Sequence, residues 1–138
     1  MIKKFRIYDK LENEYCEEPD YRWTLSRNGV LYNSENDKYY YDDETYIIEF
    51  SSGIYDNNKN ELFDGDICEV IYYNHSSPDY KVIQYISFEK GSFTLNSYNN
   101  DAELGDNFRN KCPLFYCYAP NKIKKIGNIH QNYDFLLK

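Results

Sequence analysis

The stretch Phe-Asp-Gly-Asp-Ile-Cys-Glu-Val-Ile-Tyr-Tyr at residues 63–73 sets the fold class, because a compact turn signal stands directly before an apolar run. Glycine at position 65 accepts backbone angles closed to other residues, and Asp66 can bind nearby amides. A second apolar run at residues 46–50 precedes it across a polar turn at residues 56–58. The pattern predicts consecutive strands joined by Asx-rich turns.

Further short apolar segments, separated by turn residues, occur along the chain. Alternation at residues 2–9 predicts a half-buried strand with Phe5 and Ile7 on one face. Asn28-Gly29 predicts a hairpin between alternating runs, and the connection Glu89-Lys90-Gly91 before Phe93 predicts another. The other expected strands span residues 39–41 (a short edge strand), 82–88, 93–95, 114–118 and 123–129.

Strands at this spacing favour an antiparallel barrel or sandwich over a helical bundle. A chain of 138 residues has the size of one domain. We therefore expect a mainly β single domain over residues 1–138, built as a small antiparallel, partly open barrel with an N-terminal β-hairpin extension. One or two short helices are expected as well. One would lie at residues 101–104, and one after Asn132, which would cap it while Phe135 and Leu136 pack back.

The charge is negative and uneven. The net charge is −7; residues 1–70 hold 17 acidic and 8 basic side chains, whereas residues 71–138 hold 6 and 8. This balance argues against generic binding to nucleic acid or anionic membranes, and it suits a protein partner with a basic surface. Solubility is the simpler interpretation of the charge. The candidate partner-facing acidic residues are Glu12, Glu14, Glu17, Glu18, Asp20, Asp42, Asp43 and Glu44.

The chain shows no apolar run of the roughly 18 residues that a membrane span needs, and its N-terminus lacks the core of a signal peptide. We therefore expect a cytoplasmic location. Four irregularly placed cysteines do not make a disulfide framework, so reduced thiols are expected. Cys68 and Cys117 would pack as small apolar side chains.

No complete catalytic or metal-binding motif is present. Residues 56–60 offer oxygen ligands at calcium-loop spacing, but Glu61 and Ile67 occupy positions that an EF-hand reserves for glycine and glutamate. Asp64 with Asp66, and Cys112 and Cys117 with His75 and His130, make only partial ligand sets. We therefore expect no enzyme, no metal and no cofactor.

The segment at residues 122–126 holds a basic cluster of Lys122, Lys124 and Lys125. As a strand, it would place Lys122 and Lys124 on one face and Lys125 on the other. A strand edge protected by lysines is the simpler interpretation. A groove for nucleic acid, with nearby tyrosine rings as stacking platforms, is the functional alternative.

Three punctuated blocks together resemble the YopX family of phage and prophage proteins. The resemblance is best over residues 46–73 and 123–137, and it includes the opening residues 3–10. It implies a β-rich fold and a viral or prophage origin, with no established activity. This chain departs from the family pattern at Tyr8, Lys59 and Tyr133, where tryptophan, glycine and proline are usual. The motif residues, which we interpret as structural, are Gly53, Asp56, Asn58, Gly65, Asp66, Ile67, Gly127 and Asn128.

Together these observations lead us to expect a non-enzymatic phage accessory protein that binds and sequesters a host macromolecule through an acidic face. An inhibitor of a host-defence nuclease, such as an anti-CRISPR protein, is the concrete version. The alternative is a small nucleic-acid-binding module that uses tyrosine stacking and the lysine cluster. A homo-oligomer is compatible with both.

We expect chelators and reducing agents to leave the fold intact, because no ligand set is complete and the thiols lack a framework. Thermal unfolding with and without EDTA tests the metal half of this expectation. A fall in melting temperature of more than about 5 °C, larger than a loss of roughly 1 kcal/mol would give, would revive the zinc or calcium interpretation.

Overall fold

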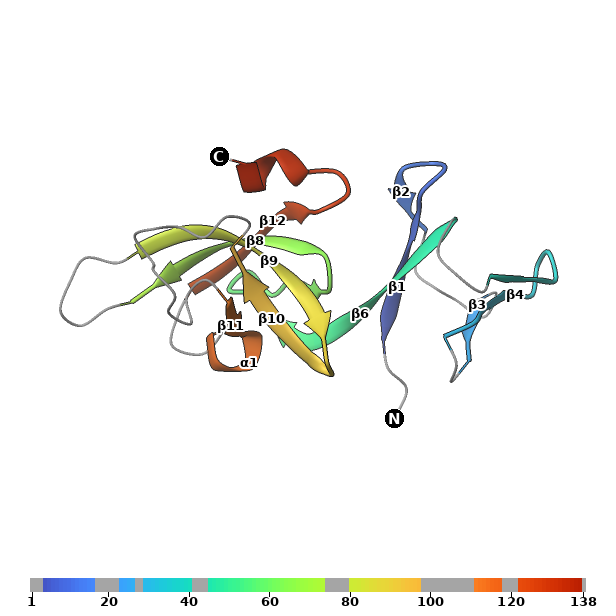
Figure 1. Cartoon of the computed structure of the whole chain (residues 1–138), viewed down its shortest axis with the longest axis horizontal. Coiled ribbons are helices and arrows are strands. Elements are labelled where there is room, and N and C mark those ends of the chain that lie inside the picture. Colours follow the sequence, from blue (N-terminus) through green and yellow to red (C-terminus); the bar gives the residue numbers. More distant parts are fainter. Residues whose placement is uncertain are drawn as a thin grey trace. The chain divides into compact units, whose positions relative to one another are not determined.

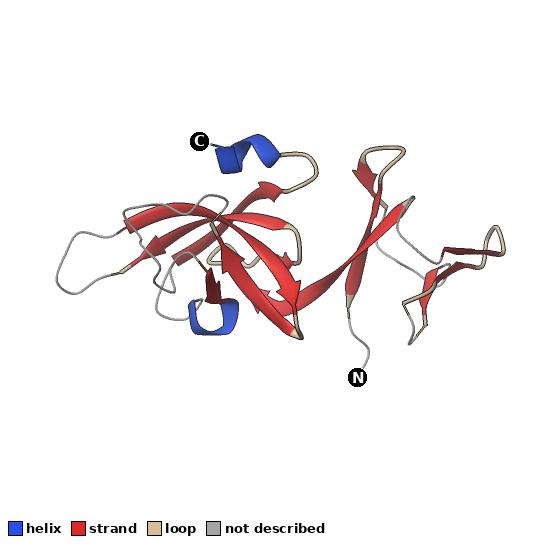
Figure 2. Ribbon diagram, viewed as in Figure 1, coloured by secondary structure: helices blue, strands red, loops and turns tan. Residues whose placement is uncertain are grey.

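The structure is a computed structural model that describes residues 4–16, 23–26, 29–40, 45–73, 80–97, 111–117 and 122–137. Its strands pair antiparallel throughout and include a curled half-barrel, which confirms the expected mainly β class (Figures 1 and 2). The chain divides into an N-terminal unit, Met1–Phe50, and a C-terminal unit, Ser51–Lys138. The expectation of a single domain over residues 1–138 stays a prediction.

The N-terminal unit holds β1 (Phe5–Asp9) and β2 (Glu14–Tyr15), with the first half of β6 (Tyr46–Tyr55) on the other side of β1. Ile7 lies opposite Ile48 and is buried, as the alternation predicted. Tyr8 is buried too, with its ring edge-to-face against Tyr15 at 5.0 Å, so β1 is covered on both faces instead of being half-buried.

The turn between β1 and β2 is held by a side-chain contact. The Tyr8 hydroxyl donates a hydrogen bond to Oδ1 of Asn13. Asn13 has a φ of 56°, a left-handed angle that asparagine accepts more readily than most residues.

A second antiparallel sheet in this unit is formed by β3 (Trp23–Leu25), β4 (Leu31–Asn33) and β5 (Lys38–Tyr40). The hairpin predicted at Asn28-Gly29 is present. Ser26 N–H donates to the Val30 carbonyl over 2.9 Å, which leaves three residues in the loop, and Gly29 has a φ of 82°. The expected edge strand at residues 39–41 corresponds to β5, and position 41 lies outside the described residues.

The C-terminal unit is built on a curled sheet with the strand order β11-β10-β9-β8-β12 (Figure 1). The strands are β8 (Asp66–Tyr72), β9 (Tyr80–Glu89), β10 (Ser92–Asn96), β11 (Lys111–Pro113) and β12 (Lys122–Asn128). The second half of β6 pairs with β7 (Glu61–Phe63). The buried core of this unit is formed mainly by Leu62, Val70, Ile86, Leu95, Leu114 and Ile123.

The connection between β9 and β10 confirms the second predicted hairpin. Glu89 pairs with Ser92, and the two residues between them, Lys90 and Gly91, have φ angles of 51° and 80°. Positive φ at both positions defines the two-residue turn whose twist matches that of the flanking strands.

The apolar run at residues 114–118, expected to be a strand, contains instead the single helical turn α1 (Leu114–Cys117). Pro113 ends β11 directly before it; proline has no N–H for a strand ladder, and its fixed φ suits the start of a helix. Leu114 is buried, whereas Phe115 is 70% exposed. A short apolar run cannot by itself distinguish these two outcomes.

The expected helix after Asn132 is the 3-10 turn η1 (Tyr133–Leu137), in which Leu136 is buried. Asn132 stands at the predicted cap position, where its carbonyl accepts a hydrogen bond from Phe135 N–H at 2.9 Å. Its side chain points elsewhere: the Oδ1 atom accepts a hydrogen bond from Asn128 N–H at 3.2 Å and so binds back toward β12. The helical turn expected at residues 101–104 lies outside the described residues. Within the part of the chain that is described, no helix is long and apolar enough to cross a membrane.

The cysteines differ from the expectation at one position. Cys112 is disulfide-bonded, so the prediction of reduced thiols is wrong there, whereas Cys16 and Cys68 are free. Cys68 packs as a buried apolar side chain, as expected, and burial raises the pKa of its thiol. The side chain of Cys117 lies outside the described part of the structure.

A tight turn at residues 56–60 joins β6 to β7. Asp56 N–H donates to the Asn60 carbonyl at 2.8 Å, and Lys59 N–H donates to the Asp56 carbonyl at 3.0 Å. Lys59 has a φ of 66°. It stands where the family that the sequence resembles usually has glycine. The turn therefore retains its left-handed position although the residue there has a side chain.

Replacing Lys59 with glycine should stabilise the protein by about 0.5–1 kcal/mol. Relief of a left-handed angle that costs about 1–2 kcal/mol outweighs the roughly 0.5–1 kcal/mol of added freedom in the unfolded chain. Urea denaturation measures the change. As a control, Lys124→Gly on the extended strand β12 should destabilise the protein. Equal losses of stability in the two variants would contradict a left-handed backbone at position 59.

Candidate functional site

The edge strand β12 is covered by the turn at residues 56–60. Asn57 N–H donates to the Ile123 carbonyl at 3.0 Å, and Ile123 N–H donates to Oδ1 of Asn57 at 2.6 Å. One residue pair further along, Lys125 N–H donates to Oδ2 of Asp56 at 2.9 Å. An edge strand exposes a row of such backbone groups, and here side chains bind them.

The Asp56 carboxylate is 6% exposed and is surrounded by donors. Its Oδ1 atom accepts hydrogen bonds from the N–H groups of Asn58 and Asn60 at 2.9 and 2.7 Å. Burial by itself would raise its pKa, but the hydrogen bonds from Lys125, Asn60 and Asn58 hold that pKa below its ordinary value of 3.8. The carboxylate thus organises an Asx turn and ties it to β12.

Asp66 is fully buried and sits beside the same strand. Its Oδ2 atom accepts from Phe63 N–H at 2.8 Å and lies 3.2 Å from the Lys125 ammonium. That ammonium also lies 5.9 Å from the centre of the Phe63 ring. Lys125 is therefore engaged within the C-terminal unit, whereas Lys122 and Lys124 are exposed, which agrees with the division of the three lysines between two faces of the strand.

The glycines of the motif act in different ways. Gly65 has a φ of 92°, and its N–H donates to the Ile86 carbonyl at 2.8 Å. Gly53 has a φ of 77° and lies where the pairing of β6 with β7 shifts register. At position 127 glycine is needed because there is no room for a side chain: a Cβ atom would clash with Oδ1 of Asn132.

The remaining motif positions complete the same frame. Ile67 is buried. Asn128 accepts hydrogen bonds at Oδ1 from His130 N–H and Gln131 N–H, at 3.1 and 3.0 Å, which forms the turn before η1. The motif residues thus meet within the C-terminal unit, where they serve turns, a register shift and a covered strand edge.

Gly127→Ala should destabilise the protein by roughly 1–3 kcal/mol, because the new methyl group overpacks against Asn132. Adding Asn132→Gly removes the contacted side chain, so the double variant should lose less than the two single variants combined. Chemical denaturation of all four proteins gives the coupling free energy. Simple additivity would show that the close approach is not the reason for glycine.

The lowered pKa of Asp56 predicts a pH dependence. The folded carboxylate holds its proton less tightly than the unfolded one, so it stabilises the fold above pH 3.8 and this contribution is lost as the pH falls through the lower folded pKa. Asp56→Asn should lower stability at neutral pH and flatten the acid decline. Asp134→Asn, which removes an exposed carboxylate from η1, is the control. If the free energy of unfolding falls with decreasing pH equally steeply in the Asp56 variant and in the unchanged protein, this assignment is contradicted.

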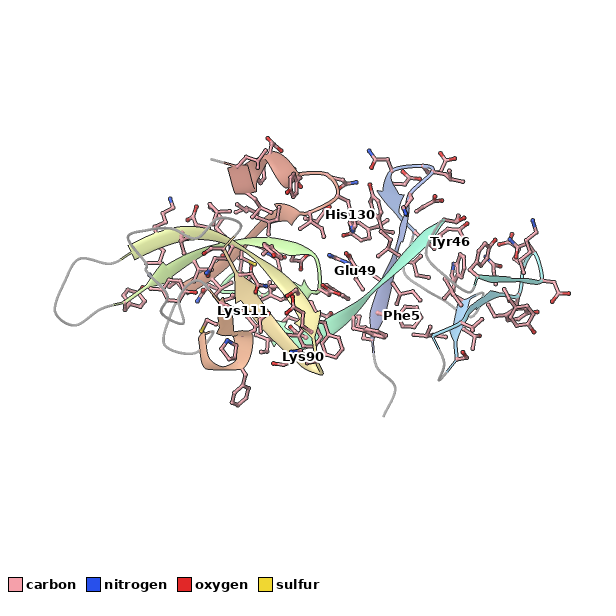
Figure 3. All side chains as sticks on the ribbon, viewed as in Figure 1. Phe5, Tyr46, Glu49, Lys90, Lys111 and His130 are labelled. Atoms are coloured by element: carbon pink, nitrogen blue, oxygen red, sulfur yellow. The ribbon has the colours of Figure 1, made fainter. Side chains whose placement is uncertain are left out.

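A buried polar cluster lies in the N-terminal unit (Figure 3 labels Glu49). Glu49 faces Arg6 across the β1–β6 pair, with Nε 2.8 Å from Oε1, and the same oxygen accepts from the Tyr15 hydroxyl at 2.8 Å. The Arg6 guanidinium lies 4.3 Å from the centre of the Tyr15 ring. The Glu49 carboxylate on β6 is therefore bound by an arginine from β1 and a tyrosine from β2.

An open cavity of about 400 Å³ lies on one face of the β3-β4-β5 sheet. Tyr32 and Tyr39 lie opposite each other in the β4–β5 register, with ring centres 4.7 Å apart and planes tilted by 34°. Tyr39 is 58% exposed. The cavity, which we name the tyrosine pocket, is lined by Thr24, Ser26, Val30, Tyr32 and Tyr39.

The other face of this sheet is packed. Trp23 contacts the rings of Tyr40 and Tyr46, with centre distances of 6.1 and 5.1 Å, and those two tyrosines lie 4.8 Å apart (Figure 3 labels Tyr46). Burial raises the pKa of Tyr46 to about 12. The alternation of side chains thus assigns one set of aromatic rings to packing and leaves Tyr32 and Tyr39 on the pocket face.

A carboxylate borders the tyrosine pocket. The Tyr32 hydroxyl donates to Oδ1 of Asp37 at 2.7 Å, and this hydrogen bond raises the pKa of the phenol. Asp37 has a φ of 55° in the β4–β5 turn, where Asn33 Oδ1 accepts from Glu35 N–H at 2.8 Å. The described lining residues carry no charge of their own; Asp37 is not among them, and it places a carboxylate at the hydroxyl end of the lining residue Tyr32.

The acidic candidates are only partly described. Glu12 and Glu14 are exposed around the β1–β2 turn, where Glu12 N–H donates to Oδ1 of Asp9. The other candidates, Glu17, Glu18, Asp20, Asp42, Asp43 and Glu44, lie outside the described residues.

Of the partial zinc set, His130 is partly buried, Cys112 is disulfide-bonded, and His75 lies outside the described residues. Among the residues that the structure describes, no three His, Cys, Asp or Glu side chains gather as a metal site.

The sequence analysis did not identify the tyrosine pocket. A usable signal was present. The polar run at residues 33–38 separates two Tyr-containing segments, and Asn33 and Asp37 both suit turns, so a hairpin there would place Tyr32 opposite Tyr39. The signal is weak because the register depends on turn length, which composition does not fix.

The fold and motif geometry define a small, mainly β protein whose distinctive blocks organise its backbone. The family model described as YopX protein matches residues 4–137, and the chain belongs to the YopX family. The match also spans residues 74–122, which lie between the two regions of best sequence resemblance. The chain is similar to a solved structure, the crystal structure of protein EF1440 from Enterococcus faecalis, at 23% identity and a TM-score of 0.55, with 99% of each chain covered. That likeness concerns the fold. No curated protein matches.

Proposed function

We propose that this YopX-family protein is a non-enzymatic binding protein that captures a basic host macromolecule through its N-terminal unit. The observation that carries the proposal is the tyrosine pocket with Asp37 at its margin. Tyrosine supplies a large contact area with few rotatable bonds, which suits recognition surfaces. The packed opposite face of the sheet holds the pocket-lining strands in place.

Charge favours a basic protein as the partner. The N-terminal unit, Met1–Phe50, contains 12 acidic and 7 basic residues, a net charge of −5. A surface of one sign speeds encounters with the opposite sign and slows those with nucleic acid. A host protein that binds the phosphates of nucleic acid has a basic surface of this kind. Inhibition of a host-defence nuclease in the host cytoplasm is therefore the concrete form of the proposal.

One observation favours the nucleic-acid alternative. Lys122 and Lys124 are both exposed on β12, and their spacing places them on one face of the strand. With Lys125 bound to Asp66, two of the three lysines of this cluster remain for phosphate. Neutralising two phosphates gives only a shallow salt dependence of binding. We therefore rank this alternative second.

Capture from a bacterial host lysate tests the function. The unchanged chain should retain a protein that loses affinity in high salt. Neutralising Glu12 and Glu14 to glutamine should slow its association and flatten the salt dependence, because charges at an interface rim act mainly on the association rate. Tyr39→Ala should weaken retention.

Lys122→Gln with Lys124→Gln is the matched control and should bind as the unchanged chain does. If the lysine variant alone loses its partner, or if the retained material is nucleic acid, the proposal is wrong and the alternative replaces it.

A further inference from the structure

The partner group that the tyrosine pocket accepts can be narrowed by its chemistry. We propose that the pocket binds the guanidinium group of an arginine side chain on the partner, stacked on the rings of Tyr32 and Tyr39 and drawn by the Asp37 carboxylate. This inference rests on the proposed binding function and names the group that is recognised.

The first argument is the geometry of the rings. The planes of Tyr32 and Tyr39 are tilted by only 34°, and Tyr39 is more than half exposed, so ring surface is accessible beside the cavity. A cation within about 6 Å of a ring centre is attracted to its negative face, and arginine makes such contacts more often than lysine. A planar guanidinium can also stack on a tyrosine ring, which an ammonium cannot do.

The second argument is the placement of hydrogen-bond acceptors. A carboxylate can accept about four hydrogen bonds, and the Tyr32 hydroxyl provides one of those to Asp37. Thr24 and Ser26, whose side chains carry hydroxyl groups, are among the lining residues, and Ser26 Oγ already accepts from Val30 N–H at 3.1 Å. The five N–H donors of a guanidinium match a ring-walled cavity with acceptors spread around it.

The third argument is charge. The described lining residues are neutral, and the unit that contains them has a net charge of −5. An anionic group would meet Asp37 without a compensating cation in the described lining. A neutral apolar side chain would use the rings but leave the carboxylate unused. Charge complementarity therefore selects a cation, and the ring geometry selects arginine over lysine.

The test uses the whole chain and three acetylated tripeptide amides of the sequence Gly-X-Gly, with arginine, lysine or citrulline at X. Citrulline keeps the shape of arginine and lacks its charge. Titration followed by amide NMR shifts should show saturable changes at residues 24–26, 30–32 and 39. The arginine peptide should bind about two- to fivefold more tightly than the citrulline peptide, the factor expected for an exposed cation–ring contact, with the lysine peptide between them.

Two variants test the groups involved. Asp37→Asn removes the charge, keeps an acceptor for Tyr32 and tolerates the left-handed backbone at this position. Tyr39→Leu keeps apolar bulk and removes the ring. Both should reduce arginine binding severalfold, while Glu35→Gln, which removes an equal charge from the same turn, should leave it nearly unchanged. Equal binding of the arginine and citrulline peptides, or equal losses in the Asp37 and Glu35 variants, would overturn the assignment.

The two proposals fail in different ways. If the arginine peptide binds the pocket but the chain captures no host macromolecule, the proposed function is wrong and the guanidinium site remains. If a basic host protein is captured equally well by the unchanged chain and by Tyr39→Leu, the function survives and the guanidinium site is wrong.

Discussion

The hydrogen bonds that join the turn at residues 56–60 to β12 are the constraint on which the C-terminal unit depends. They connect Asp56 to Lys125 and Asn57 to Ile123, groups separated by 69 and 66 positions in the chain. Without them the outer backbone groups of β12 would face solvent as an unprotected edge. The Lys125 side chain extends the same connection to buried Asp66, so strand edge, turn and ion pair form one network. Removing one partner from such a buried pair is costly, because the other charge remains uncompensated.

The network explains why the YopX motif is divided into separated blocks. Each block provides a local device, such as the turn at Asp56, the left-handed Gly65 or the close approach at Gly127, and the devices meet only after the sheet has formed. The departure at Lys59 shows how far one block can vary. The left-handed angle remains although the glycine is absent, because the hydrogen bonds of Asp56 define the turn independently of that residue.

Sequence reasoning predicted the features that depend on local chemistry. The alternation along β1, the hairpins at Gly29 and Lys90-Gly91 and the short helix after Asn132 follow from residue types and spacing. Features set by tertiary contacts were missed. Leu114 begins a helical turn because Pro113 stops the strand, and the side chain of Asn132 binds back to Asn128. The ion pair of Lys125 with a buried aspartate 59 positions earlier was not predicted, and the tyrosine pocket required the β4–β5 register. These contacts join residues that a local sequence pattern does not relate to one another.

Tyr8 and Tyr32 share an arrangement that bears on the abundance of tyrosine in this chain. Each stands five positions before a turn residue with positive φ, Asn13 and Asp37 respectively, and each donates its hydroxyl to the side chain of that residue. The phenol acts as a staple across the turn, while its ring packs along the strand. Exchange of either tyrosine for phenylalanine would preserve the ring packing but remove the hydrogen bond that holds the turn. Phenylalanine is therefore not equivalent to tyrosine at these two positions. A stapled ring also has less freedom to lose on binding, which makes Tyr32 a pre-organised wall of its pocket.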